Sequence, residues 1–229
     1  MNGNLVSVIL PVFNAEKYVE EAIKSVLCQT YQDIELICVN DKSTDNSLSL
    51  LESFGNKIIF TNNENNCGTA ESRNKGLRLA RGEFLAFIDN DDIWESNKLE
   101  LQMNHFDNNP DVDICFSYMK SFLSPELSGN VMNLRFCPPD PIPGYIPSTI
   151  MVKKTAFEKV GYFDSRWENG ESIDWLFKAK EAGLNFGIVD DVLVKRRIHE
   201  TNKGVLASST SKREYLKIIR ESLARRKNP

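Results

Sequence analysis

An acidic cluster follows a short apolar run near the middle of the chain. Asp89, Asn90, Asp91 and Asp92 come directly after residues 84–88, whose apolar side chains predict a buried strand. Carboxylate oxygens suit Mg²⁺ or Mn²⁺, which commonly join one or two carboxylates to a diphosphate. A bound cation would also remove the repulsion among three neighbouring carboxylates. The alternative is a solvated loop in which Asp91 or Asp92 caps the next helix.

Polar segments also follow three other predicted strands. Residues 11–14, 40–45 and 62–68 each come after an apolar run, as residues 89–92 do. Ligands of open parallel sheets bind beyond the carboxyl ends of the strands, so we expect these segments to meet around one ligand. Asp41 could accept hydrogen bonds from a base or a ribose. The glycine-rich loops of nicotinamide-binding and P-loop proteins do not occur here, which disfavours both classes.

Strands and helices alternate through the first half of the chain. Apolar runs predict strands over residues 5–10, 34–40, 57–62 and 83–88, and helical spacing predicts helices over 16–29, 43–54 and 69–80. This order predicts a parallel sheet covered on both faces. In the second half we expect helices over 96–106, 173–183 and 211–227, strands over 111–119, 185–189 and 192–199, and a strand leading into a helix over 148–161.

The composition is that of an ordinary globular protein. The 229 residues form one large domain or two small ones, and a net charge of −4 gives no argument for a nucleic-acid partner. Five scattered cysteines without a CxxC pair disfavour a disulfide framework or a zinc site and favour a reducing cytoplasm. No apolar run approaches the roughly 20 residues of a membrane span, and the N-terminus reads as a strand, not a signal peptide.

Two longer stretches carry a resemblance to a known family. The residues "VSVILPVFNAEKYVEEAIKSVLCQTYQDIELICVNDKSTDNS" and "NNCGTAESRNKGLRLARGEFLAFIDNDD" closely resemble family 2 glycosyltransferases of the GT-A fold. The resemblance implies an α/β fold with a Rossmann-like, mostly parallel sheet flanked by helices in a single domain. It implies a nucleotide-sugar donor, most commonly a UDP-sugar, a divalent metal (Mn²⁺ or Mg²⁺), and inversion at the anomeric carbon. Residues 1–110 would bind the donor, residues 111–205 would hold the acceptor side, and residues 206–229 would form a basic amphipathic helix.

The resemblance also assigns residues of the donor side. It places Asp41 on the base, Asp89 near the ribose and Asp91 on the metal. Where the commoner pattern is V-D-D-G-S, this chain has Asn40 and Lys42. In the later stretch "NNCGTAESRNKG", Ser72 stands before Arg73 where the family usually has Ala. Arg73 would contact a phosphate, or would be a surface helix residue. The nucleotide-binding set that the resemblance implies is Pro11, Phe13, Asn14, Asp41, Gly68, Arg73, Asp89 and Asn90.

The acceptor side departs from the family pattern. Most relatives have Glu-Asp where this chain has Glu171 and Ser172, and the Asp is often the catalytic base. Asp174 and Glu171 are therefore both candidates for the base. We favour Asp174, with the alternative that it caps a helix. "RRIHETN" resembles the late segment whose His199 can ligate the metal.

The acceptor and the partners are left open by the sequence. A lipid-linked sugar, a polysaccharide, a protein or a small molecule would each serve as acceptor, and residues 138–147, with five prolines, are expected to shape its site. The basic final helix is either a solvated face or a contact with a membrane surface or a partner, a homodimer included. We expect a cytoplasmic protein, peripheral at the inner face of the membrane if that helix binds lipid. A non-catalytic nucleotide-sugar binder and a sugar nucleotidyltransferase are the alternative functions.

Overall fold

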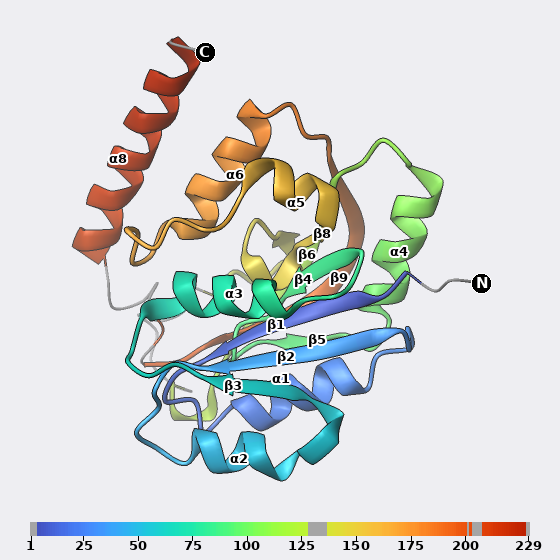
Figure 1. The fold of residues 1–229 in the computed structure, drawn as a ribbon, viewed down its shortest axis with the longest axis vertical. Helices are drawn as coiled ribbons and strands as arrows, with labels where there is room; N and C mark the ends of the chain where they lie inside the picture. Colours follow the sequence, from blue (N-terminus) through green and yellow to red (C-terminus); the bar gives the residue numbers. More distant parts are fainter. Residues whose placement is uncertain (1–3, 128–136, 201, 203–207, 228–229) are drawn as a thin grey trace.

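The computed structural model describes residues 4–127, 137–200, 202 and 208–227. Its strands form one sheet in the order β3-β2-β1-β4-β8-β6-β9-β5, and β7 pairs with β6 (Figure 1). This arrangement confirms the predicted α/β class. Within the described ranges no helix is long and apolar enough to cross a membrane. Residues 128–136, which precede the proline-rich residues 138–147, lie outside the described residues.

The first half has the predicted alternation of strands and helices. Strands β1, β2, β3 and β4 pair in parallel. Strand β3 lies at the edge of the sheet, so its side chains are exposed or half-buried although its sequence is an apolar run. The elements are β1 (Val6–Val12), α1 (Val19–Leu27), β2 (Ile34–Asn40), α2 (Ser47–Ser53), η1 (Gly55–Lys57), β3 (Ile59–Asn62), α3 (Gly68–Leu79) and β4 (Phe84–Phe87).

Alternate residues of the central strands pack into two separate apolar layers. Val8 and Leu10 of β1 pack with α1, whereas Ile9 of the same strand packs with α3. This division follows from the period of two in a strand, which sends neighbouring side chains to opposite faces. Because both faces are covered, the carboxyl ends of β1, β2 and β4 are the part of the sheet left accessible to a ligand.

The second half is mixed rather than parallel. Strand β8 pairs antiparallel with β4 and β6, β9 pairs parallel with β6, and β5 pairs antiparallel with β9. The mostly parallel sheet therefore describes only the first half. The elements are β5 (Ile93–Trp94), α4 (Lys98–Asn108), β6 (Ile114–Leu123), η2 (Pro125–Leu127), β7 (Ile142–Pro143), η4 (Pro147–Thr149), β8 (Met151–Lys153), α5 (Lys154–Val160), α6 (Glu171–Glu181), β9 (Phe186–Ile198) and α8 (Ser208–Lys227).

The two strands predicted over residues 185–199 are one strand, β9. Its pairing with β6 shifts register, because Ser117 pairs with Val189 and Tyr118 with Val192. Asp190 and Asp191 are left out of the ladder and are exposed. This bulge breaks the apolar pattern, so the sequence suggested two strands. The strand runs on to Ile198 and delivers His199 to the end of the sheet.

Helix α6 is fixed against α5 by aromatic packing. The Trp175 ring stacks on Phe157 with centroids 4.9 Å apart, and its Nε1 donates to the Gly161 carbonyl at 2.8 Å. Trp175 is 2% exposed, so its indole nitrogen has the partner that burial requires. This packing sets the direction in which the first turn of α6, with Glu171, faces the rest of the molecule.

The first residue of helix α4, Lys98, is a fully buried lysine. Lys98 Nζ donates to Gln102 Oε1 at 2.6 Å and lies 4.0 Å from the centre of the Trp94 ring. Burial disfavours the charged form and lowers the pKa of Lys98 to about 7. Lys98 therefore makes the stability of the fold depend on pH.

Replacing Lys98 by Met is expected to stabilise the fold near neutral pH. The ordinary lysine pKa is 10.5, so between pH 7 and 10.5 the unfolded chain binds more protons than the folded one. The stability of the wild type must then rise with pH across that window, by at most about 1.4 kcal/mol per pH unit from this group. Urea unfolding at about pH 7 and about pH 9 checks this. Lys98→Met should lose the pH-dependent gain, and the exposed control Lys57→Met should keep it. A slope unchanged by Lys98→Met would contradict the prediction.

Candidate active site

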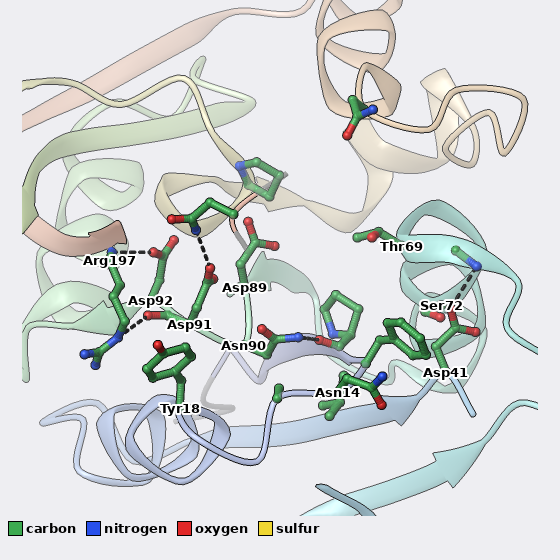
Figure 2. Close-up of a pocket in the computed structure, with 18 of the residues that line it drawn as sticks. Asn14, Tyr18, Asp41, Thr69, Ser72, Asp89, Asn90, Asp91, Asp92 and Arg197 are labelled. Atoms are coloured by element: carbon green, nitrogen blue, oxygen red, sulfur yellow. Dashed lines mark hydrogen bonds between the residues drawn. The ribbon is translucent and has the colours of Figure 1, made fainter. Parts of the chain in front are cut away.

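One large pocket lies beyond the carboxyl ends of β1, β2 and β4. Its volume is about 950 Å³. The donor-side segments expected from the sequence line one part of it, and residues from α6, α8 and the end of β9 line another (Figure 2). The predicted residues that line it are Pro11, Phe13, Asn14, Asp41, Gly68, Arg73, Asp89, Asn90, Asp91, Glu171 and His199; Asp174 does not.

The acidic cluster is built into the structure and is not a solvated loop. Asp92 is 3% exposed; its carboxylate accepts hydrogen bonds from Ser148 Oγ at 2.5 Å and from the Arg197 backbone N–H at 3.2 Å. Burial, with the charges of Asp91 and Asp89 beside it, raises the pKa of Asp92 well above its ordinary value. The cluster leads into β5, and α4 begins only at Lys98, so the helix-capping alternative was wrong.

Asp91 meets the end of β9, as the sequence predicted. His199 Nε2 lies 2.9 Å from Asp91 Oδ2, and Asn202 Nδ2 donates to the same oxygen at 2.9 Å. The His199 backbone N–H donates to Asn202 Oδ1. Asn202 was not among the predicted site residues, although an amide three residues after the candidate histidine is visible in the sequence.

Asp91 and His199 form a donor set that fits a hard divalent cation. Mn²⁺ and Mg²⁺ are commonly held by one or two protein side chains, the remaining positions being taken by phosphate oxygens and water. Among the described residues, no group of three or more His, Cys, Asp or Glu side chains is arranged to hold a metal. Asp91 and His199 therefore suit a metal whose other ligands come from a bound diphosphate, and they do not form a closed protein site.

Arg197 supports the acidic cluster from β9. Its Nε donates to the Asp91 carbonyl at 3.1 Å, and its guanidinium pairs with Glu21. The guanidinium carbon lies 4.7 Å from the ring centres of both Tyr18 and Phe122. Figure 2 shows Arg197 beside Asp91 and Asp92, with Tyr18 below them. The Arg197 guanidinium, which contacts both aromatic rings, thus holds the turn that carries Asp91.

Asp41 joins β2 to the start of α3. Its two carboxylate oxygens accept hydrogen bonds from the Cys67 and Gly68 backbone N–H groups, each at 2.8 Å. Asn63 Nδ2 donates to Asp41 Oδ1 at 2.8 Å. Gly68 has φ +84°, a conformation that glycine adopts without strain. The predicted base-binding residue thus also fixes the loop that leads into α3.

The remaining predicted donor-side residues surround the mouth of the pocket. Phe13 is 44% exposed, although it is a large aromatic residue. Asn14 Oδ1 accepts a hydrogen bond from the Thr44 N–H at 2.8 Å, and Asn90 Nδ2 donates to the Pro11 carbonyl at 3.2 Å. The first bond ties the loop after β1 to the loop after β2, and the second ties the loop after β4 to the end of β1.

Arg73 connects the two sides of the pocket. It is 2% exposed, so the alternative of a surface helix residue was wrong. Its Nη2 lies 2.5 Å from Asp89 Oδ1, and its Nη1 bonds Glu171 Oε1. The two carboxylates raise the pKa of Arg73 against the effect of burial. One guanidinium therefore links the acidic cluster to α6.

The first turn of α6 separates the two candidate bases. Glu171 lines the pocket, and only its Oε1 has a hydrogen-bond partner among the described residues. Asp174 is 1% exposed and faces away from the pocket wall, with Lys178 Nζ at 2.6 Å and Arg225 Nη2 at 3.6 Å. A base must reach the proton that it removes, so this position contradicts our preference for Asp174. The helix starts at Glu171 after Gly170, so Asp174 does not cap it either.

Comparisons with known proteins agree with this geometry. Residues 7–161 match the family model described as glycosyl transferase family 2. The chain is 33% identical over 209 residues to an uncharacterised glycosyltransferase of Rickettsia typhi, with 86% of this chain and 64% of the relative covered. It is 45% identical over 105 residues to the Escherichia coli UDP-Glc:alpha-D-GlcNAc-diphosphoundecaprenol beta-1,3-glucosyltransferase WfgD, with 45% of this chain and 42% of that protein covered.

Two solved structures share the fold at low sequence identity. Staphylococcus aureus TarS, crystallised in complex with UDP-GlcNAc, superposes with a TM-score of 0.71 at 23% identity, with 86% of this chain and 60% of that chain covered. The Pyrobaculum calidifontis mannosyltransferase PcManGT, in complex with GDP-Man and Mn²⁺, gives a TM-score of 0.65 at 19% identity, with 86% and 58% covered. The chain thus spans less than two thirds of both neighbours and of the Rickettsia relative.

Proposed function

Because the chain belongs to glycosyl transferase family 2, we propose that its pocket binds a nucleoside-diphosphate sugar, with UDP as the first choice, and transfers the sugar to an acceptor hydroxyl with inversion. One observation carries the proposal: Arg73 joins the acidic cluster to Glu171, the carboxylate of α6 that lines the pocket. The acidic cluster is where the divalent cation that accompanies a diphosphate would bind. UDP as the nucleotide is supported by the UDP-Glc in the name of WfgD and by the UDP-GlcNAc bound to TarS. The GDP-Man bound to PcManGT makes GDP the alternative nucleotide.

On the donor side, this chain's residues bind and orient the nucleotide. Phe13 offers an exposed ring on which a base can stack, and Asp41 and Asp89 offer acceptors for the base and the ribose. Asp91 and His199 would hold the divalent cation, which supplies neutralisation of charge on the departing diphosphate. Arg73 supplies a second fixed positive charge beside Asp89.

On the acceptor side, Glu171 takes the proton of the attacking hydroxyl. The acceptor oxygen forms its bond to the anomeric carbon on the face opposite the diphosphate, and the bond to the diphosphate oxygen breaks with its electron pair. The single displacement inverts the anomeric centre and needs no covalent intermediate. Ser172, at the usual position of the base, has no carboxylate, so the neighbouring Glu171 takes this role.

A donor panel tests this function. Thermal shift and calorimetry with UDP-Glc, UDP-GlcNAc and GDP-Man, each with and without Mn²⁺, should show one base preferred and affinity increased by Mn²⁺, because ligand binding stabilises the folded state. UDP release with a synthetic GlcNAc-diphospholipid, and the anomeric configuration of the product, then report transfer. Binding without turnover of any acceptor would favour the non-catalytic binder, and failure of every donor to bind would contradict the proposal.

We also propose that the outward face of α8 contacts an anionic membrane. Leu216, Ile219 and Leu223 share one side of the helix and are 56%, 44% and 51% exposed. The exposed cations around them are Lys212, Arg213, Lys217, Arg220 and Arg226. The described acids of the same helix, Glu214 and Glu221, are engaged with residues of the domain. An apolar stripe among cations suits an anionic lipid surface, where a lipid-linked acceptor would be found.

Vesicle sedimentation of the full chain measures this contact. Vesicles containing phosphatidylglycerol should bind the wild type, vesicles of phosphatidylcholine alone should not, and the paired change Leu216→Asp with Leu223→Asp should abolish binding. Equal binding of the variant would contradict the membrane contact. A dimer in solution that the same changes dissociate would assign the face to a second copy. Cytoplasmic residence and a homodimer stay predictions.

A further inference from the structure

The inner face of α8 contacts the loop that precedes α6. The Glu214 carboxylate accepts hydrogen bonds from the backbone N–H groups of Glu168 and Asn169, each at 3.0 Å. Tyr215 Oη lies 3.5 Å from the Asn169 carbonyl. Residues 168 and 169 come just before Gly170, the N-cap of α6. Side chains more than 40 residues later in the chain therefore hold the entry to α6.

Close packing at Gly170 strengthens this contact. A Cβ added to Gly170 would collide with Ile218 Cδ1 and would lie 3.6 Å from the Tyr215 ring. Ile218 is fully buried. A side chain at position 170 would therefore force Ile218 of α8 to shift, and the residue that follows Gly170 is Glu171.

Helix α8 is also fastened to the far end of α6. Ser222 Oγ donates to Glu181 Oε1 at 2.5 Å, and Arg225 Nε donates to Glu181 Oε2 at 2.6 Å. Figure 1 shows α8 standing beside α6. At the other end, Ser211 and Tyr215 form part of the pocket wall together with Glu168, Asn169 and Glu171. The helix therefore reaches the pocket while it is anchored at a distance from it.

We propose that α8 is a positioning element of the acceptor side, and that Glu214 is the positioning residue that sets the place of Glu171. The proposal rests on the proposed function, in which Glu171 takes the acceptor proton. Arg73 holds Glu171 from the donor side, and the Glu214 contact holds the backbone just before it. A carboxylate that accepts two N–H bonds ahead of a helix also complements the positive end of the helix dipole. Loss of this contact leaves the loop free to shift, and a misplacement of about 1 Å can cost about 100-fold in rate.

Three variants of the full chain test the positioning role. Glu214→Ala removes both acceptors, and Glu214→Gln retains one oxygen that can accept. Glu221→Ala is the matched control, because Glu221 lies on the same helix but pairs with the exposed side chain of Arg166. The readouts are kcat and the donor KM for release of the nucleoside diphosphate from whichever donor the panel selects, and hydrogen exchange at residues 168–170. We expect Glu214→Ala to lower kcat by about 10-fold to 100-fold with the donor KM unchanged. Glu214→Gln should be intermediate, and Glu221→Ala should match the wild type.

Two kinetic results would contradict the positioning role of Glu214. A kcat of Glu214→Ala within about twofold of the wild type would overturn the positioning role. So would a loss that appears in the donor KM and equally in Glu221→Ala. If Glu214→Ala does not fold, Glu214→Gln carries the same comparison. If the wild type releases no nucleoside diphosphate from any donor of the panel, the proposed function fails. The exchange rates at 168–170 still decide whether α8 holds the loop, because rates unchanged in Glu214→Ala would overturn that too.

Discussion

Replacement of Asp91 by Asn is expected to lower metal-dependent transfer by about 10²-fold or more. Asn has nearly the same shape, and its amide oxygen can still accept from Asn202 Nδ2, which lies 2.9 Å from Asp91 Oδ2 in the wild type. It carries no negative charge, so the partnership of Asp91 with His199 in holding the cation is lost. The measurement is the initial rate of UDP release across a titration of Mn²⁺.

The control for Asp91→Asn is Asp107→Asn, the same chemical change on the exposed side of α4. Asp107 does not line the pocket, so its variant should keep the wild-type rate and the wild-type Mn²⁺ requirement. A fully active Asp91→Asn enzyme, or full activity of the wild type after chelation of divalent ions, would remove Asp91 from the proposed mechanism.

Replacement of Glu171 by Gln should lower kcat by about 10²-fold to 10⁴-fold, because general-base catalysis contributes on that scale. The glutamine oxygen can still accept the hydrogen bond from Arg73, so the link between α6 and α3 is retained. The donor affinity measured by calorimetry should then stay near that of the wild type. Loss of turnover with donor binding intact is the signature of a missing base rather than of a damaged pocket.

Asp174→Asn is the matched comparison on the same helical turn. It neutralises a carboxylate that faces Lys178 and Arg225 and does not line the pocket. We expect it to change the free energy of unfolding, because it neutralises the buried carboxylate that pairs with the partly exposed Lys178 at 2.6 Å. Its kcat should remain close to the wild-type value. Normal turnover in Glu171→Gln, or a collapse of kcat in a folded Asp174→Asn, would reverse the assignment.

The positions of the residues predicted for the donor side could be predicted because these residues lie near strand ends. Asp41 and Asp91 follow buried strands, and in a parallel sheet these ends lie at one edge. The meeting of Asp91 with His199 was expected only through the family resemblance, since 107 residues of intervening chain carry no local signal. Alternation of strands and helices likewise predicted the first half of the sheet but not the mixed pairing of the second.

The acceptor side depends on contacts that the local sequence does not encode. Whether Glu171 or Asp174 faces the pocket depends on the rotation of α6, which Trp175 sets by stacking on Phe157. The hydrogen bonds from Glu168 and Asn169 to Glu214 join segments that periodicity treats as unrelated. His105 Nε2 is buried beside Gly187, because β9 packs against α4. Tertiary packing decided each of these positions.

A sheet continuous through both halves of the chain limits how the molecule can move. The backbone ladder between β4 and β8 ties the first half of the chain to the half that carries α6, and β9 extends the same sheet to β5. A hinge between the halves would have to break these hydrogen bonds, so the two halves cannot open and close like separate lobes. We therefore expect substrate entry and product release to depend on movement of the loops that line the pocket, while the sheet keeps its shape.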